Sequence, residues 1–141
     1  MASESEKMTV MICVDNRFGM LFNKRRLSRD SAVTADIVTS FADGRLYCSE
    51  ISRPLFEERA GVVIRKDFLE KAGENDRCFV EDRDIAPYLE KITRIVLYHW
   101  NRDYPADFYF DPAVLSRFTK RSVRDLAGTS HETVTKEVYE R

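Results

Sequence analysis

The order of short apolar runs along the chain restricts its fold more than any other feature. Each run has little polar content and is typical of a strand buried in a sheet. We expect such strands at 8–14, 45–48, 62–64, 78–80 and 93–100. Segments with helical spacing or helix-start signals lie at 31–41, 54–59, 67–75 (a single turn) and 85–92. The alternation predicts an α/β fold of three αβα layers around a mostly parallel central sheet, with 93–100 as a central strand.

The last third of the chain has a different pattern. Residues 101–112 make a polar and aromatic connection that contains two prolines. Two mostly polar strands follow at 118–126 and 133–140, and turn residues at 128–131 join them. We expect a solvent-facing antiparallel hairpin at the edge of the sheet. Residues 8–141 then form a single domain, and the polar residues 1–7 are expected to be a disordered lead-in.

Composition excludes several classes of partner. The net charge is −1, and nucleic-acid binding normally requires a strongly basic face, so we expect no nucleic-acid partner. No apolar run is long enough to cross a bilayer, so we expect no membrane partner. The three cysteines have no short spacing between them, which favours reduced core thiols in a cytoplasmic protein. With only His99 and His131 to assist them, we expect no metal site.

Several stretches resemble the dihydrofolate reductase family. The segment 13–19, Cys-Val-Asp-Asn-Arg-Phe-Gly, resembles that family's A-V-D-x-x-x-G opening, and Asp30 lies where the family places an acid at a helix start. Residues 88–99 are similar to the family's short helix and the L-x-L-T-H strand that follows it. Residues 107–112 are similar to its D-x-x-F-P segment, and residues 137–141 to its C-terminal end. The resemblance implies a dihydrofolate-reductase-like fold across nearly the whole domain.

The departures from that family fall where the cofactor would bind. The family carries G-[RK]-x-T after its second strand, to hold dinucleotide phosphates at a helix N-terminus, and this chain has Ser-Glu-Ile-Ser at 49–52. The family's paired glycines, which allow close approach to the cofactor, are replaced by Glu-Asp-Arg-Asp at 81–84. A threonine on the family's central strand is replaced by Tyr98. The resemblance therefore disfavours ordinary NADPH use and leaves the cofactor undetermined.

Asp30 is the candidate catalytic residue. A carboxylate at a helix start inside a pocket can bind an amino-pyrimidine-like edge or act as an acid or base. The other interpretation is that it only caps the helix. Arg29 and the cluster at 24–26 are candidates for binding an anionic ligand, and solvated loop charges are the alternative.

A second group of candidates lies at the C-terminal end of the expected central strand, where open α/β sheets place ligands. Tyr98, Trp100, Arg102 and Asp103 could line a ligand site, in which Trp100 or Tyr104 stacks on a planar ring and Arg102 takes an anion. A strand end with core aromatics and surface charges is the competing interpretation. His131 is interpreted as a turn residue, because its neighbours Ser130 and Glu132 should point away from it.

Three hypotheses for function follow. The first is a dihydrofolate-reductase-like scaffold that binds a small planar or anionic ligand near Asp30, Tyr98 and Trp100 without normal NADPH binding. The second is an NADPH-dependent reductase of a pterin, folate or related heterocycle with an unusual cofactor mode. The third is a non-enzymatic interaction module that uses its C-terminal hairpin or the aromatic segment 98–110. The sequence does not determine the ligand, the oligomeric state or the pathway.

Overall fold

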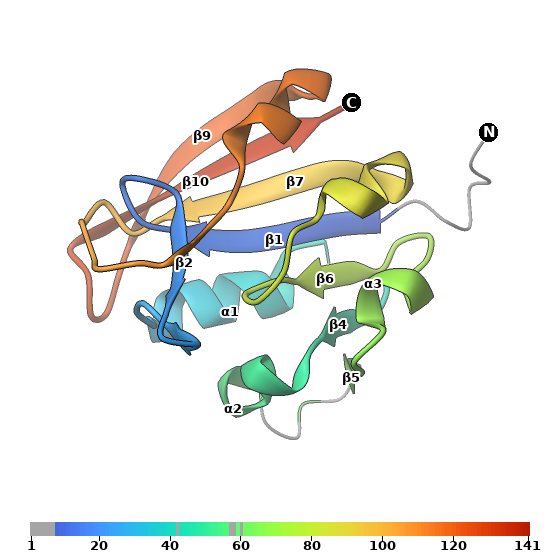
Figure 1. Ribbon diagram of the computed structural model, residues 1–141, viewed down its shortest axis with the longest axis horizontal. Coiled ribbons are helices and arrows are strands. Elements are labelled where there is room, and N and C mark those ends of the chain that lie inside the picture. Colours follow the sequence, from blue (N-terminus) through green and yellow to red (C-terminus); the bar gives the residue numbers. More distant parts are fainter. Residues whose placement is uncertain (1–7, 42, 57–58, 60) are drawn as a thin grey trace.

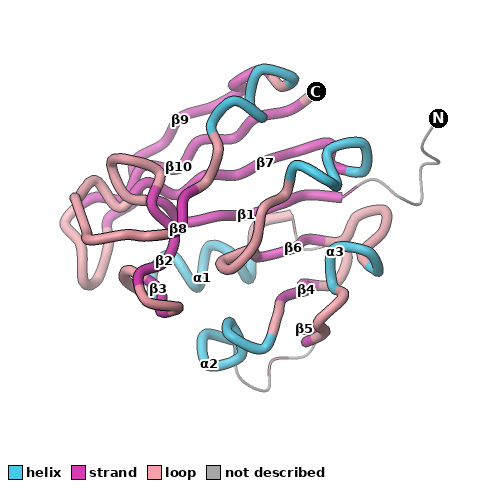
Figure 2. Tube along the Cα trace, viewed as in Figure 1, coloured by secondary structure: helices cyan, strands magenta, loops and turns pink. Residues whose placement is uncertain are grey.

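The computed structural model describes residues 8–41, 43–56, 59 and 61–141. Its main sheet has seven strands in the order β5-β4-β6-β1-β7-β10-β9 (Figures 1 and 2). The strands are β1 (Met8–Val14), β4 (Leu46–Cys48), β5 (Val62–Ile64), β6 (Arg77–Phe79), β7 (Ile92–His99), β9 (Thr119–Ala127) and β10 (Thr133–Glu140). The first five in the spatial order are parallel, and β10 is antiparallel to β7 and β9. The predicted mostly parallel sheet with a C-terminal antiparallel hairpin is confirmed.

Helices cover both faces of this sheet, because side chains along each strand alternate between two apolar cores. In β1, Val10 and Ile12 belong to one core and Met11 belongs to the other. The Met11 core also contains buried residues of α1 (Ser31–Thr39) and α2 (Arg53–Phe56). The opposite core is covered by α3 (Phe68–Lys71) and by the 3₁₀ helices η3 (Ala86–Lys91) and η4 (Pro112–Arg117). The three expected layers are present.

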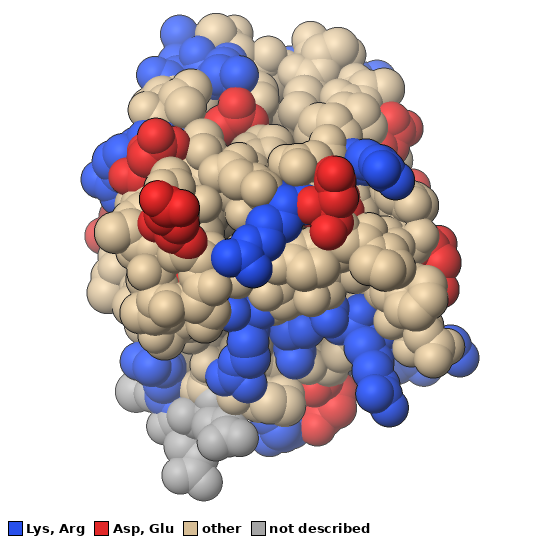
Figure 3. Space-filling view, turned by 90° about the vertical axis from the view of Figure 1, so that its left-hand side faces the viewer, with Lys and Arg blue, Asp and Glu red and all other residues tan. Residues whose placement is uncertain are grey.

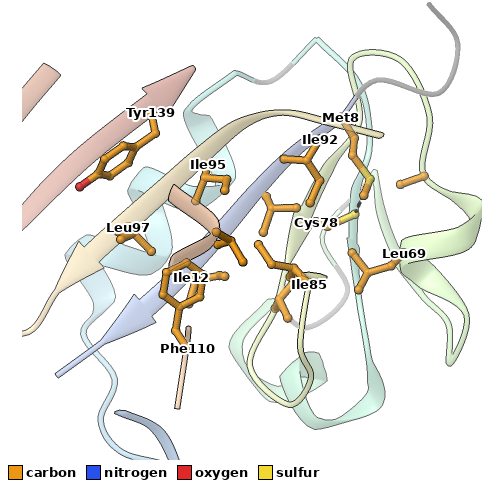
Figure 4. Packing of buried hydrophobic residues seen from close by; sticks show 14 of the residues in the cluster. Met8, Ile12, Leu69, Cys78, Ile85, Ile92, Ile95, Leu97, Phe110 and Tyr139 are labelled. Atoms are coloured by element: carbon orange, nitrogen blue, oxygen red, sulfur yellow. Dashed lines mark hydrogen bonds between the residues drawn. The ribbon is translucent and has the colours of Figure 1, made fainter. Parts of the chain in front are cut away.

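The core that contains Val10 and Ile12 packs residues from the N-terminal and C-terminal parts of the chain against each other. Figure 4 shows side chains from β1, β7, α3 and the segments around Ile85 and Phe110 converging on one interior. Ile12, Ile92 and Leu97 have no solvent-exposed surface. Burial of each such side chain contributes roughly 1.5–3 kcal/mol. The core therefore holds β1 and β7 in fixed register, and with them the loops that leave their carboxyl ends.

Residues 15–30, where no strand was predicted, contain part of a second sheet. The order of this sheet is β3-β2-β8, with β2 at Gly19–Phe22, β3 at Arg25–Arg26 and β8 at Phe108–Tyr109. Asn23 and Lys24 join β2 to β3 with φ angles of 52° and 63°, the left-handed conformation that a tight hairpin turn requires. No glycine marks this turn, so it was not predicted.

Other boundaries differ modestly from those expected. The segment 85–92 forms the 3₁₀ helix η3, which has a proline in its first turn. A further 3₁₀ helix, η2 (Glu50–Ser52), precedes α2. The middle strand of the seven is β1, and β7 lies beside it. Strand β9 is the exposed edge, whereas alternate residues of β10 are buried between β7 and β9, so only one strand of the hairpin is solvent-facing.

Two further predictions concern the N-terminal residues 1–7 and the absence of a membrane-spanning segment. The expected disordered lead-in, 1–7, lies outside the described residues. Among the helices that the structure describes, none is both long and apolar enough to span a bilayer.

Candidate functional site around His131

Asp30 lies at the start of α1 and is buried, with 2% of its surface exposed. Its backbone is extended and its carboxylate accepts a hydrogen bond from the Ala32 backbone N–H at 2.9 Å, as an N-cap residue does. Capping accounts for only one of its contacts. The remaining contacts come from the turn between β9 and β10, about a hundred residues further along the chain.

That turn wraps three consecutive residues around the Asp30 carboxylate. The backbone N–H groups of Thr129, Ser130 and His131 donate to it at 2.9, 2.7 and 3.0 Å. The Thr129 hydroxyl donates to the other oxygen at 2.9 Å. Gly128 permits this approach, because a Cβ there would lie 2.2 Å from the His131 carbonyl oxygen and 2.7 Å from the Asp30 Oδ2. Asp30 therefore fastens the β9–β10 turn to the first turn of α1.

This environment keeps Asp30 ionised. Burial alone would raise the pKa of its carboxyl, since it disfavours the charged form. The hydrogen bonds from Thr129, His131 and Ser130 outweigh burial and hold the pKa well below its usual value. At neutral pH the group is a fixed negative charge inside the loop cluster.

His131 occupies the centre of the cluster. Its Nδ1 lies 3.1 Å from Asp30 Oδ2, and its side chain is 2% exposed. A carboxylate can only accept, so Nδ1 carries a proton and, in the neutral ring, Nε2 is an acceptor. Two hydroxyls reach that nitrogen: Ser28 Oγ at 3.0 Å and Tyr104 Oη at 3.1 Å. The ring also stacks on Trp100, with centroids 4.6 Å apart and planes at 21°.

Asp15 holds the segment that carries Tyr104. It follows β1 directly, is 1% exposed, and accepts hydrogen bonds from the backbone N–H groups of Arg17 and Gly19 at 2.9 and 2.6 Å. Its second oxygen accepts from the Tyr104 N–H at 3.0 Å. The loops after β1 and β7 are thus joined by one carboxylate, just as Asp30 joins α1 to the hairpin turn.

A groove of about 340 Å³ lies on the outer side of Tyr104, within the usual size range of small-molecule sites. It is lined by Phe22, Asn23, Arg25, Arg26, Leu27, Tyr104 and Pro105. Phe22 is 49% exposed and lines this groove. Arg26 is paired with Glu81, while Arg25 makes no ion pair within the described residues. Figure 3 shows this end of the molecule, where Lys and Arg side chains form a band across the lower half of the face.

The structure brings some of the candidate residues together and separates others. Asp30 and Trp100 both contact His131, and the adjacent Arg29 is exposed. Arg102 and Asp103 lie exposed on the loop after β7. The void bordered by Arg29, Asp30 and Trp100 has a volume of about 10 Å³, enough for a single water.

Tyr98 lies in a different polar cluster, away from His131. It is fully buried, and its hydroxyl donates to Asp36 Oδ2 at 2.6 Å. Lys136 Nζ lies 2.7 Å from the same oxygen. Burial raises the pKa of Tyr98, and its hydrogen bond to the Asp36 carboxylate raises it further. This arrangement ties α1 to β7 and β10, and it makes Tyr98 a structural residue in the geometry observed.

A buried acid lies beyond the carboxyl end of β6. Glu81, two residues after the end of β6, is 7% exposed and accepts a hydrogen bond from Ser52 Oγ at 2.7 Å. Arg26 reaches both Glu81 oxygens, at 2.9 and 3.0 Å. Beyond this pair lies a second groove of about 360 Å³, lined by Ser49, Glu50, Ile51, Ile64, Arg65, Lys66, Asp82 and Arg83.

Within the described residues no group of three or more His, Cys, Asp and Glu side chains is placed to hold an ion. Burial raises the pKa of all three cysteine thiols, to about 12 for Cys48, and so keeps them protonated.

Ser28 is a member of the cluster that the sequence did not single out, and Tyr104 and His131 were considered for other roles. The hydroxyl groups that reach the His131 ring come from positions 28 and 104, and not from its sequence neighbours. Nothing in local spacing indicates contacts across 103 residues. The sequence feature that could have indicated Ser28 as a member of the cluster is its position two residues before Asp30 at a helix start.

Comparison with known proteins supports the fold class that these elements define. The chain has a dihydrofolate-reductase-like fold. The dihydrofolate reductase from Enterococcus faecalis complexed with NADP(H) and RAB-propyl matches it with a TM-score of 0.68 over 97% of both chains, at 7% sequence identity. No protein-family model matches the sequence, and a search of curated proteins finds no relative. The likeness at this identity shows the fold alone.

Proposed function

We propose that this protein binds a small planar, anionic molecule in the groove beside Tyr104. The observation that carries the proposal is the pairing of an exposed aromatic, Phe22, with an arginine free of ion pairs in the described chain, Arg25, in one concave site. An aromatic face stacks on planar rings, and a guanidinium binds carboxylates or phosphates through two parallel hydrogen bonds. Tyr104 completes the groove and touches His131 behind it.

The groove also has the rigid support that a binding site needs. Its floor is a hairpin whose strand β2 pairs with β3 and β8. Asp15 fixes the Tyr104 backbone, and the Asn23 N–H donates to Asp107 across the groove base at 3.0 Å. A preformed site loses less entropy on binding than a mobile loop.

We further propose that the protein does not bind NADPH in the manner of the reductase family. Glu81, where the family has glycine, is a buried carboxylate engaged with Arg26 and Ser52. Because Glu81 pairs with Arg26, that arginine has no free charge to offer a dinucleotide phosphate, and the Glu81 side chain fills the space that a glycine would leave. Tight, saturable NADPH binding by calorimetry would contradict this part of the proposal.

A thermal-shift screen with nucleotides, pterins, folates and aromatic carboxylates tests the binding proposal, since a ligand of the native state raises the melting temperature. Trp100 is the single tryptophan, so its fluorescence gives a second readout beside His131. Arg25→Gln should abolish the shift produced by the best ligand, with no change in the stability of the free protein. Arg121→Gln, an exposed arginine on β9, is the matched control and should retain it. If the ligand-induced thermal shift is lost in both variants, or retained in both, the proposed binding groove is wrong.

One observation favours a second candidate, a reductase with an unusual cofactor mode. The groove at the carboxyl ends of β4, β5 and β6 contains Arg65, Lys66 and Arg83, and this edge of a parallel sheet is where dinucleotides commonly bind. Loss of NADPH absorbance in the presence of dihydrofolate, above the rate without protein, supports that activity. No loss above background excludes this reaction.

A further inference from the structure

Ser28, His131 and Asp30 form a continuous hydrogen-bonded series that joins the segment before α1 to the β9–β10 turn. Ser28 Oγ lies 3.0 Å from His131 Nε2, and His131 Nδ1 lies 3.1 Å from Asp30 Oδ2. We propose that Ser28 is a nucleophile that accepts the acyl group from small carboxylic esters, with His131 as its general base and Asp30 as the residue that positions the imidazole.

The order of contacts is the one that nucleophile activation needs. A serine hydroxyl is a weak nucleophile unless an adjacent base removes its proton, and the base must present an unprotonated nitrogen to the hydroxyl. Asp30 fixes the proton on Nδ1, which directs the free Nε2 lone pair toward Ser28. Six donor groups hold the Asp30 carboxylate in place, and the Trp100 stack restricts the ring plane.

Ser28 lines the void of about 10 Å³ beside Asp30 and Trp100, and residues next to it line the proposed groove. Its side chain is half-buried, in contrast to the almost fully buried Asp30 and His131. The preceding residue, Leu27, and the other His131 partner, Tyr104, both line the groove. Arg29, which follows Ser28, is exposed and makes no ion pair in the described part of the chain. An arginine beside the nucleophile favours esters that carry a negative charge.

The reaction balances without any cofactor. Ser28 Oγ attacks the ester carbonyl carbon while its proton passes to His131 Nε2, and a C–O bond forms. The bond to the leaving alcohol then breaks, and the departing oxygen takes the proton from Nε2. Water attacks the acyl-serine, giving a proton to Nε2, and that proton returns to Ser28 Oγ as the carboxylic acid leaves. Asp30 remains ionised throughout.

Tyr104 regulates the base in this arrangement. The neutral imidazole offers one lone pair at Nε2, and the Tyr104 hydroxyl at 3.1 Å competes for it with Ser28. Removing that hydroxyl leaves the lone pair to Ser28 alone. Tyr104→Phe should therefore increase the reactivity of Ser28, by about twofold if the two hydroxyls share the nitrogen equally. A purely structural network predicts no increase.

The test is covalent labelling of the full chain with a fluorophosphonate, read by intact mass and peptide mapping, together with the rate of 4-nitrophenyl acetate hydrolysis. The expected result is one adduct on Ser28 that is absent in Ser28→Ala, present in the matched control Ser122→Ala (an exposed serine on β9), and formed faster in Tyr104→Phe. No adduct on the wild type, or an adduct that persists in Ser28→Ala, overturns the inference. A Ser28 adduct that forms no faster in Tyr104→Phe overturns the role given to Tyr104.

This inference rests on the proposed function only for the location of its substrate. The two can fail separately, because reversible binding in the groove is measured by thermal shift and depends on Arg25. Covalent labelling is measured by mass and depends on Ser28. If ligands shift the melting temperature but Ser28 is not labelled, the proposed nucleophile is wrong and the proposed binding site is supported. If Ser28 is labelled but no ligand shifts the melting temperature, the nucleophile is supported and the binding site is wrong.

Discussion

Replacing Asp30 by asparagine should destabilise the protein by roughly 3 kcal/mol. The carboxylate accepts from six donor groups, which reach both of its oxygens. An asparagine has one acceptor oxygen, and three donors from Ser130 and His131 point at the Oδ2 position. The amide nitrogen must then face Ala32, leaving that N–H without an acceptor at a cost of about 1–2 kcal/mol. The bonds that remain lose their charge assistance, which accounts for the rest.

Urea denaturation at neutral pH measures this loss directly, and thermal unfolding should show a decrease of roughly 10 °C for a chain of this size. Glu132→Gln, which makes the same charge change at an exposed position in the same turn, should alter stability by less than about 0.5 kcal/mol. The pKa of the Asp30 carboxyl is lowered in the folded state, so its stabilisation is complete above the unfolded value of about 3.9. It is lost as pH falls from there toward the folded pKa.

The difference in the free energy of unfolding between the wild type and Asp30→Asn should therefore decrease at acidic pH. A difference near zero at neutral pH would show that the turn is held by other contacts. A difference that stays constant down to pH values below the unfolded pKa would refute the assignment of Asp30 as an ionised anchor.

Three further outcomes follow from the same contacts. Gly128→Ala should cost about 3 kcal/mol by urea denaturation, because the added methyl meets a backbone carbonyl at 2.2 Å; unchanged stability would mean that the turn can relax. Tyr98→Phe should cost roughly 1.5–3 kcal/mol through the lost bond to Asp36 and should leave ligand-induced thermal shifts intact. Arg26→Met should cost roughly 3 kcal/mol, since it leaves Glu81 buried without its cation, and an equal loss in an Arg26→Met, Glu81→Met double variant would contradict that cause.

The sequence predicted the main sheet well because its strands are short, continuous apolar runs. Strand β1 matches its expected limits, and β7 is displaced by one residue. Small secondary structure was harder to predict. The β2–β3 hairpin turns at Asn23 and Lys24 with positive φ angles, a conformation for which glycine is the usual signal. Strands of two to four residues also carry too little periodicity to be recognised.

The candidate site was predicted only in part. Asp30 and Trp100 were predicted as site residues, and both contact His131, which was interpreted as a turn residue. Their link depends on the β9–β10 turn returning to α1, a contact set by topology and absent from any local spacing. Tyr98 was named for its position on β7, but the strand period places its side chain on the α1 face, where Asp36 binds it.

Backbone-amide chemical-shift mapping tests the central claim most directly, namely that the loop cluster around His131 and its groove form the functional site. The probes are small planar carboxylates and phosphates added to the labelled full chain. We expect the largest chemical-shift changes at residues 22–27, 104–106 and 129–131. Shifts concentrated instead on 49–51, 65–66 and 82–83, at the opposite groove, would contradict it.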